Sequence, residues 1–113
     1  MIKIISLLRR KDGMSHEQFV QHWAEVHGPL LQQNPAVRRY VQSHIVSERP
    51  TPRGAIEGEI DGIVELWFDD YEAFERSWKS PINQLIIADS ETFIGAMKSF
   101  IVEDKIVIPG PGA

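Results

Sequence analysis

The pattern of hydrophobic and polar positions along the chain predicts four β-strands. Residues 2–8 form a short β-branched run that ends in charged residues, which is typical of a strand. A second strand is expected over residues 36–48, and a third over residues 60–68, where apolar side chains recur at every second position. The last strand is expected at about residues 99–108. Residues 49–59 hold two prolines and two glycines, and we expect this segment to be a mobile loop.

A first helix is expected from about residue 16. Ser15 and Gln18 have the spacing of a capping box, in which each side chain binds the backbone N–H of the other residue. At about 100° per residue, the apolar side chains gather on one side of this helix, and His27 falls within that apolar arc. Gly28 and Pro29 follow, and the proline removes a helical hydrogen bond. We therefore expect the chain to turn here, either to shape a pocket or because one helix ends and another begins.

Polar residues that precede apolar runs predict helix starts in the second half of the chain. The expected N-caps are Asp69 or Asp70, Ser80 and Asp89. Tyr71, Phe74 and Trp78 recur at i, i+3 and i+7 after the first cap, so they are expected to share one helix face. Pro81 fits the first position of the next helical turn, where its missing N–H costs no hydrogen bond.

The resulting order is strand, helix, strand, strand, helical region, strand. This order is the split βαβ arrangement of ferredoxin-like domains, an α+β fold with helices on one face of an antiparallel sheet. Residues 1–108 are expected to form this single domain, and residues 109–113 are expected to be a flexible tail.

The second face of the sheet is expected to need a cover. The first strand is apolar on both faces, and Ile63 and Trp67 lie opposite the core side of the third strand. A second copy packed sheet to sheet is the economical cover, so we expect a homodimer with a dimeric α/β-barrel architecture. Four charged residues would then meet across or around the two-fold axis: Lys3, Arg39, Asp61 and Glu65.

Composition narrows the classes of function. The 113 residues carry a formal net charge of -4, which disfavours binding to a phosphate backbone, so we expect no nucleic-acid partner. The chain has no cysteine, which excludes disulfides and thiolate sites and makes a cytoplasmic location the simpler interpretation. The opening apolar stretch is too short to span a bilayer, and we expect no membrane association.

His27 and Tyr40 are the candidate catalytic residues. An imidazole on an apolar helix face could act as a general acid or base near neutral pH, and the alternative is a core histidine whose hydrogen bonds are satisfied. Tyr40 could donate a hydrogen bond to a developing oxyanion, or it could pack with its hydroxyl bonded to the protein. Gln42 shares the strand face of Tyr40, and His44 is expected near the end of that strand.

The other polar and aromatic residues give weaker indications. Trp23 and Phe68 would suit an aromatic or alicyclic ligand, although such residues more often form a core. Asp61 and Glu65 share a strand face and could be paired acids, but a place at the dimer interface or in solvent is the simpler interpretation. The histidines lack a metal-binding spacing, and we expect neither a metal nor another cofactor.

Several segments make the chain resemble the EthD family along nearly its whole length. They are the opening strand, "MSHEQF" at 14–19, "HWAEVHGPL" at 22–30, "RRY" at 38–40, "ELWF" at 65–68 and "ADSETFI" at 88–94. Within that family, "MSHEQF", "GEIDGIVELWF" and "FIGAMKSFIVED" look most similar to the methylmuconolactone methylisomerase branch. His27 and Tyr40 fall on positions implicated in the chemistry of that branch. This chain has Leu66 where the branch has a cysteine.

The resemblance implies a small-molecule enzyme whose pocket lies between the helices and the sheet. We expect cofactor-independent proton transfer, as in an isomerase or cyclase, on a lactone or a phenolic metabolite. The expected substrate-binding residues are Trp23, Leu66, Phe68 and Gln42. One alternative is a cofactor-free monooxygenase or an accessory protein of an oxygenase system for ether or aromatic degradation. The other is a non-catalytic binder of a hydrophobic metabolite.

Overall fold

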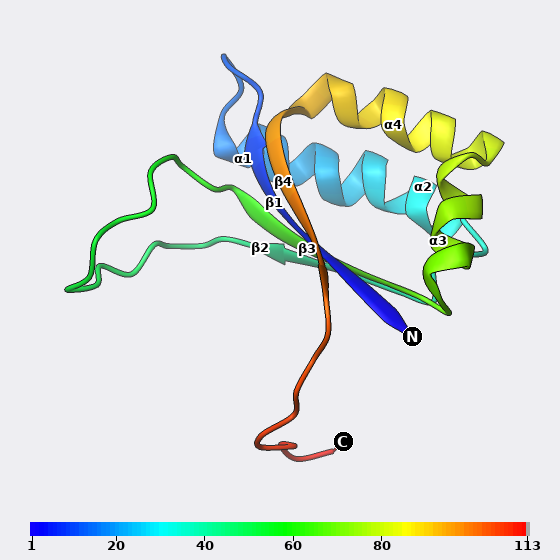
Figure 1. Cartoon of the computed structure of the whole chain (residues 1–113). Coiled ribbons are helices and arrows are strands. Elements are labelled where there is room, and N and C mark those ends of the chain that lie inside the picture. The colour runs from blue at the N-terminus through cyan, green and yellow to red at the C-terminus, as the bar shows by residue number, and fades with distance from the viewer. Residues whose placement is uncertain (113) are drawn as a thin grey trace.

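The computed structural model describes residues 1–112 and shows a four-stranded antiparallel sheet with helices on one face (Figure 1). The strands lie in the order β2-β3-β1-β4. Their bounds are Ile2–Arg10 for β1, Arg39–His44 for β2, Gly62–Phe68 for β3 and Ile94–Val102 for β4. This is the ferredoxin-like α+β arrangement that the order of elements predicted.

The helices begin where the capping residues predicted. α1 His16–His22, η1 Trp23–His27 and α2 Gly28–Gln32 form one continuous helical segment, and α3 Tyr71–Trp78 and α4 Pro81–Phe93 follow β3. The predicted capping box is present, with Ser15 and Gln18 each accepting from the other's backbone N–H. Asp70, rather than Asp69, caps α3, and Ser80 caps α4. Within residues 1–112, no helix has the length and hydrophobicity that a membrane span requires.

Two boundaries in the second half differ from the prediction. α4 runs without a break, so Asp89 lies inside the helix and the prediction that it is an N-cap is wrong. β4 begins at Ile94 rather than at about residue 99, and its ladder with β1 stops at the pair of Lys3 and Val102. Residues 103–108 have no neighbouring strand to bond with, so the predicted strand is wrong over that stretch. β2 and β3 are also shorter than predicted.

Residues 23–27 form a π-helical turn, so the chain stays helical through Gly28 and Pro29, where a turn was predicted. The Gly28 N–H bonds to the carbonyl of Trp23, five residues back. Pro29 has no N–H, so the regular α-helical hydrogen bond from residue 29 to the carbonyl four residues back cannot form. Trp23 and His27, at the two ends of this turn, are both buried, at 1% and 6% exposed.

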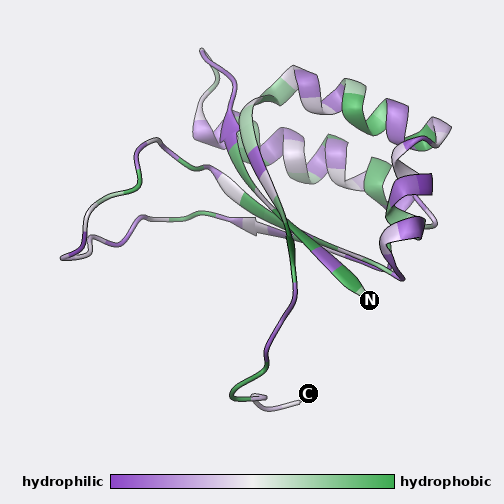
Figure 2. Ribbon diagram, viewed as in Figure 1, coloured by the Kyte–Doolittle hydropathy of each residue, from purple (hydrophilic) through white to green (hydrophobic). Residues whose placement is uncertain are grey.

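The core lies between the sheet and the first helical segment. Phe19, Trp23 and Phe93 are fully buried and pack with Leu8 and Val64. The ring centroid of Phe19 lies 5.5 Å from that of Trp23 and 5.3 Å from that of Phe93. Hydrophobic and hydrophilic residues alternate along the helices, as expected for helices with one buried side (Figure 2). This cluster holds the π-helical turn against the sheet.

Within residues 1–112, no helix covers the other face of the sheet (Figure 1). Lys3 lies on this open face, with its Nζ 3.0 Å from a Glu65 oxygen and 4.9 Å from the centroid of the Trp67 ring. Most of the loop between β2 and β3, and residues 103–112, project away from the body of the molecule (Figure 1). The second of these segments carries three exposed apolar residues, Ile106, Val107 and Ile108. The open sheet face, with Phe100, and this C-terminal arm therefore both expose apolar residues that no other part of residues 1–112 covers.

Candidate active site

A cavity of about 280 Å³ lies between the helices and the sheet. Five of the six predicted site residues line it, namely His27, Tyr40, Trp23, Leu66 and Phe68. Most of the remaining wall is apolar, with side chains from β1, β3, α3 and α4. A cavity of this size with a few polar groups suits a single or fused ring that carries oxygen substituents.

His27 reaches the cavity from the π-helical turn and is held by a carboxylate. Its Nδ1 lies 2.8 Å from Oδ2 of Asp89 on α4, and its ring packs edge-on against Phe93 with centroids 5.0 Å apart. An ionised carboxylate can only accept a hydrogen bond, so Nδ1 carries the proton and Nε2 of the neutral ring holds a lone pair. Within residues 1–112, Nε2 has no hydrogen-bond partner and is not sealed off, which leaves it free to bind a ligand.

Asp89 also binds a second histidine. His22 Nε2 lies 3.0 Å and 3.1 Å from the two carboxylate oxygens, and the His22 side chain is more exposed than that of His27. Sequence reasoning missed this role of Asp89, because its contact with His27 spans 62 residues of the chain. The available signal was its place in "ADSETFI", one of the segments that carry the EthD resemblance. Within residues 1–112, no three histidine or carboxylate groups are arranged to hold a metal ion.

The environment of His27 sets its charge. Burial lowers the pKa of His27 below the ordinary value of 6.5, although the hydrogen bond and the charge of Asp89 act in the opposite direction. The charge of His22 lowers the pKa of His27 further. The ring is therefore neutral at pH 7, which is the state that a general base requires.

The hydroxyl oxygen of Tyr40 accepts two hydrogen bonds from the protein. It accepts from Trp23 Nε1 at 3.1 Å and from Gln42 Nε2 at 2.9 Å. Within residues 1–112, its own proton has no acceptor, so the hydroxyl can donate to a ligand oxygen. Burial raises the pKa of Tyr40, and the two donated hydrogen bonds only partly oppose this rise. Tyr40 is therefore a neutral donor at pH 7.

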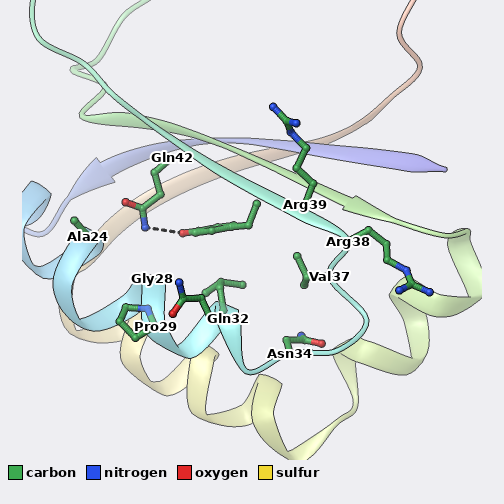
Figure 3. Close-up of a pocket in the computed structure, with 11 residues that line it drawn as sticks. Ala24, Gly28, Pro29, Gln32, Asn34, Val37, Arg38, Arg39 and Gln42 are labelled. Atoms are coloured by element: carbon green, nitrogen blue, oxygen red, sulfur yellow. Dashed lines mark hydrogen bonds between the residues drawn. The ribbon is translucent and has the colours of Figure 1, made fainter. Parts of the chain in front are cut away.

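Gln42 does not line the cavity. It lines the neighbouring cleft and contacts the Tyr40 hydroxyl (Figure 3). Its Nε2 donates both to the Tyr40 hydroxyl and to the Trp23 carbonyl, the latter at 2.8 Å. His44 Nε2 lies 2.9 Å from Gln42 Oε1, so an N–H of His44 can fix the orientation of the amide. Residues at every second position of β2 thus form a chain of hydrogen bonds that ends at the hydroxyl of Tyr40.

A second cleft of about 480 Å³ lies on the outer side of Tyr40, between α2 and β2 (Figure 3). Tyr40 and Leu31 line both the cleft and the cavity, so they form the wall that separates them. Arg38 and Arg39 border the cleft, but Arg38 is paired with Asp69 at 2.8 Å. Figure 3 shows the Arg39 guanidinium directed away from the cleft, and it lies over the Trp67 ring. These two cations therefore do not make the cleft an anion site.

Asp61 and Glu65 do not form a pair of acids. Asp61 is 1% exposed and accepts hydrogen bonds from the Arg10 backbone at 2.7 Å, from the Arg10 guanidinium at 2.8 Å and from His16 at 2.8 Å. Burial acts to raise the pKa of Asp61, but the hydrogen bonds from Arg10 and His16 outweigh it and lower the pKa. Because this carboxylate is buried between β1 and the start of α1, the prediction that it lies at a dimer interface is wrong. Glu65 pairs with Lys3 instead.

Leu66 stands beside Tyr40 on the neighbouring strand, and both side chains line the cavity. The leucine supplies apolar contact to a bound ring and has no group that could form a covalent bond or move a proton. Among the predicted site residues that line the cavity, the chemically active groups are therefore the imidazole of His27 and the hydroxyl of Tyr40.

Several known proteins are similar to this chain in sequence and in fold. A family model described as "EthD domain" matches residues 11–96. A 4-carboxymethyl-4-methylbutenolide mutase from Pseudomonas reinekei is 31% identical over 109 residues, which cover 94% of this chain and 100% of the relative. The structure of an EthD family protein from Bacillus halodurans matches with a TM-score of 0.73 and 24% identity, covering 93% of this chain and 99% of that one.

A dimeric ferredoxin-like protein of unknown function from Thermobifida fusca has the same fold. It matches with a TM-score of 0.66 and 17% identity, covering 89% of this chain and 88% of that one. The resemblance read from the sequence motifs and the predicted ferredoxin-like fold are both confirmed, and the chain belongs to the EthD family.

Proposed function

We propose that the protein is an enzyme that rearranges a small oxygenated ring compound, a lactone or a phenolic metabolite, by proton transfer without a cofactor. The observation that carries this proposal is a pair of groups, on His27 and Tyr40, that line the same cavity. A neutral His27 has a free Nε2, and Tyr40 has a hydroxyl proton with no acceptor among residues 1–112. The relative described as a butenolide mutase supports an isomerase-type reaction.

In the proposed reaction, His27 Nε2 takes a proton from a carbon atom next to a carbonyl of the ring. The electron pair of the broken C–H bond moves towards the carbonyl, and the resulting enolate oxygen accepts a hydrogen bond from Tyr40. The imidazolium, stabilised by the carboxylate of Asp89, then returns the proton to a different atom of the ring. Substrate and product are isomers, so no oxidant or co-reactant is needed.

The remaining site residues would hold the ring. Trp23, Leu66 and Phe68 would contact its apolar surface, and Gln42 would act through Tyr40 rather than on the substrate. The apolar wall would exclude water and so strengthen the hydrogen bond from Tyr40 to the enolate. With a leucine at position 66, the reaction would proceed without a covalent intermediate at that wall.

The working unit is proposed to be a homodimer formed through the open face of the sheet. The uncovered sheet face around Trp67 and the exposed apolar residues of the C-terminal arm support this assembly. A solved structure with the same fold is described as dimeric. Lys3, Glu65 and Arg39 would lie at or near the interface, whereas Asp61 would not.

Turnover tests the proposed function. A panel of butenolides, other lactones and phenolic metabolites would be incubated with the wild-type protein, His27→Ala and His22→Ala. We expect His27→Ala to lower kcat/KM by about 100-fold or more, because it removes the general base. His22→Ala is the matched control, since it removes the other partner of Asp89 and leaves the bond between Asp89 and His27 in place. Equal rates for wild type and His27→Ala would remove His27 from the mechanism.

Two further readouts separate the alternative functions. Oxygen uptake that accompanies the disappearance of a phenolic substrate would favour a cofactor-free monooxygenase. Ligands that bind by calorimetry and are all recovered chemically unchanged would favour a non-catalytic binder.

A further inference from the structure

Asn83, in the first turn of α4, is a buried polar residue that the proposed reaction does not use. It is 8% exposed and lines the cavity. Its Nδ2 donates to the Trp78 carbonyl at 3.1 Å, which fixes the orientation of the amide. Within residues 1–112, Oδ1 has no hydrogen-bond donor, and it is not sealed off from a probe of water size. Water can therefore reach this acceptor in the free protein, and a ligand that displaces the water would have to supply a donor in its place.

Ser77 lies in the same corner, where α3 leads into α4. It is 5% exposed and lines the same cavity. Its Oγ accepts from Asn34 Nδ2 at 2.9 Å, and within residues 1–112 the hydroxyl proton has no acceptor. The corner therefore offers one free acceptor, on Asn83, and one free donor, on Ser77.

This corner lies at the start of α4, whereas Asp89, which binds His27, lies about half the length of α4 further along. Asn83 and Asp89 are six positions apart on α4, which corresponds to about 9 Å along the helix axis at 1.5 Å per residue. Because Asp89 binds His27, the wall of the cavity carries polar groups at two separate places, His27 at one and Asn83 with Ser77 at the other. A fused ring of ordinary size, with one hydrogen bond at each end, spans such a separation.

We infer that Asn83 and Ser77 form a second recognition site, which binds a hydroxyl group at the far end of the substrate ring. The inference rests on the proposed function in that the substrate occupies this cavity. A hydroxyl group can donate to Asn83 Oδ1 and accept from Ser77, so it satisfies both free groups. A carboxylate can only accept, and it would face the lone pairs of Oδ1. The substrate class is therefore a hydroxylated ring with a second oxygen function at the opposite end.

Calorimetry with two rigid probes tests this inference. 2-Naphthol carries one hydroxyl, and 2,6-dihydroxynaphthalene carries a second one at the far end of the same ring system. We expect the wild-type protein to bind the diol about tenfold more tightly, which is the effect of one well-made hydrogen bond. In Asn83→Leu, which keeps the bulk of the side chain, the advantage of the diol should fall to about twofold or less.

Ser90→Ala is the matched control. Ser90 also lines the cavity, but its hydroxyl already donates to the Ile87 carbonyl at 2.6 Å, so the preference for the diol should survive this change. Ser77→Ala provides a second variant, with circular dichroism to check that each variant folds. If the wild-type protein binds both probes with equal affinity, this measurement alone overturns the inference. A retained preference for the diol together with unchanged turnover in His27→Ala would instead refute the proposed reaction alone.

Discussion

Gly62 on β3 is in direct contact with the indole ring of Trp23. A side-chain carbon at position 62 would overlap the six-membered part of the indole. On the neighbouring strand, His44 pairs with Gly62, and its ring centroid lies 5.0 Å from that of Trp23. The absence of a side chain at position 62 therefore sets how closely the π-helical turn approaches the sheet. It also sets where Trp23 Nε1 meets Tyr40.

Gly62→Ala should lower the free energy of unfolding by about 1–3 kcal/mol, because the added methyl group forces the indole to move in a packed core. Urea unfolding followed by circular dichroism measures this change. Gly54→Ala is the control, since nothing lies within 4 Å of a side-chain carbon at that position. Two variants of equal stability would show that the indole is not clamped against β3.

Two aspartate–arginine pairs should differ sharply in their contribution to stability. Asp61→Asn should lower the free energy of unfolding by about 1–3 kcal/mol, because Asp61 accepts three hydrogen bonds from Arg10 and His16 in the interior and an amide cannot accept all of them. Asp69→Asn removes a pair with Arg38 at the same N–O distance of 2.8 Å, but both of those side chains are about half exposed, and we expect little change. Denaturant midpoints of the two variants provide the comparison, and equal midpoints would contradict the burial argument.

The low pKa of His27 predicts a pH dependence of stability. The unfolded chain binds a proton at His27 near pH 6.5, whereas burial holds the folded-state pKa lower. The unfolded state therefore binds more protons between these two values. The contribution of His27 to stability is complete above pH 6.5 and declines as the pH falls from there towards the folded-state pKa.

Urea unfolding of the wild type and of His27→Gln between about pH 5 and pH 7.5 measures this contribution. We expect the wild type to lose more stability than His27→Gln as the pH falls through that range. A difference between the two proteins that stays constant with pH would show that His27 has the same pKa in both states.

The proposed dimer predicts a result in light scattering. At micromolar concentration the wild-type protein should have twice the mass of one chain, and Trp67→Glu should shift it towards the monomer by placing a charge on the open sheet face. Leu85→Glu adds the same charge at an exposed position of α4 on the helix side, and it should remain dimeric. A wild-type protein that stays monomeric over the whole concentration series would exclude the dimer.

Local patterns predicted those parts of the fold that local interactions decide. The capping box at Ser15 and the proline after Ser80 mark helix starts because their partners lie within three residues. Alternation along β3 predicted its buried side for the same reason, since the side-chain direction in a strand has a period of two.

Contacts between distant parts of the chain decide the features that sequence reasoning missed. Asp89 precedes an apolar run, as a helix cap does, and its bonds to His22 and His27 have no local signature. The alternating pattern predicts Asp61 on the same strand face as Glu65, yet Asp61 lies buried just before β3, where Arg10 of β1 donates hydrogen bonds to it. The acceptor on Asn83 matters only because the helices leave a cavity beside it. The periodicity of side chains describes a single helix or strand, whereas each of these features depends on a contact between two of them.

The π-helical turn from Trp23 to His27 has a consequence for how the family's sequences should be aligned. A π-helical turn accommodates one residue more than a regular turn while the helical parts on either side keep their phase. Without the widening, every residue after it would be rotated by about 100° about the helix axis, and Leu31 would leave the interior. Helices of relatives that are one residue shorter should therefore carry their gap between positions 23 and 28. A gap anywhere else along this segment would turn one half of its buried side outward.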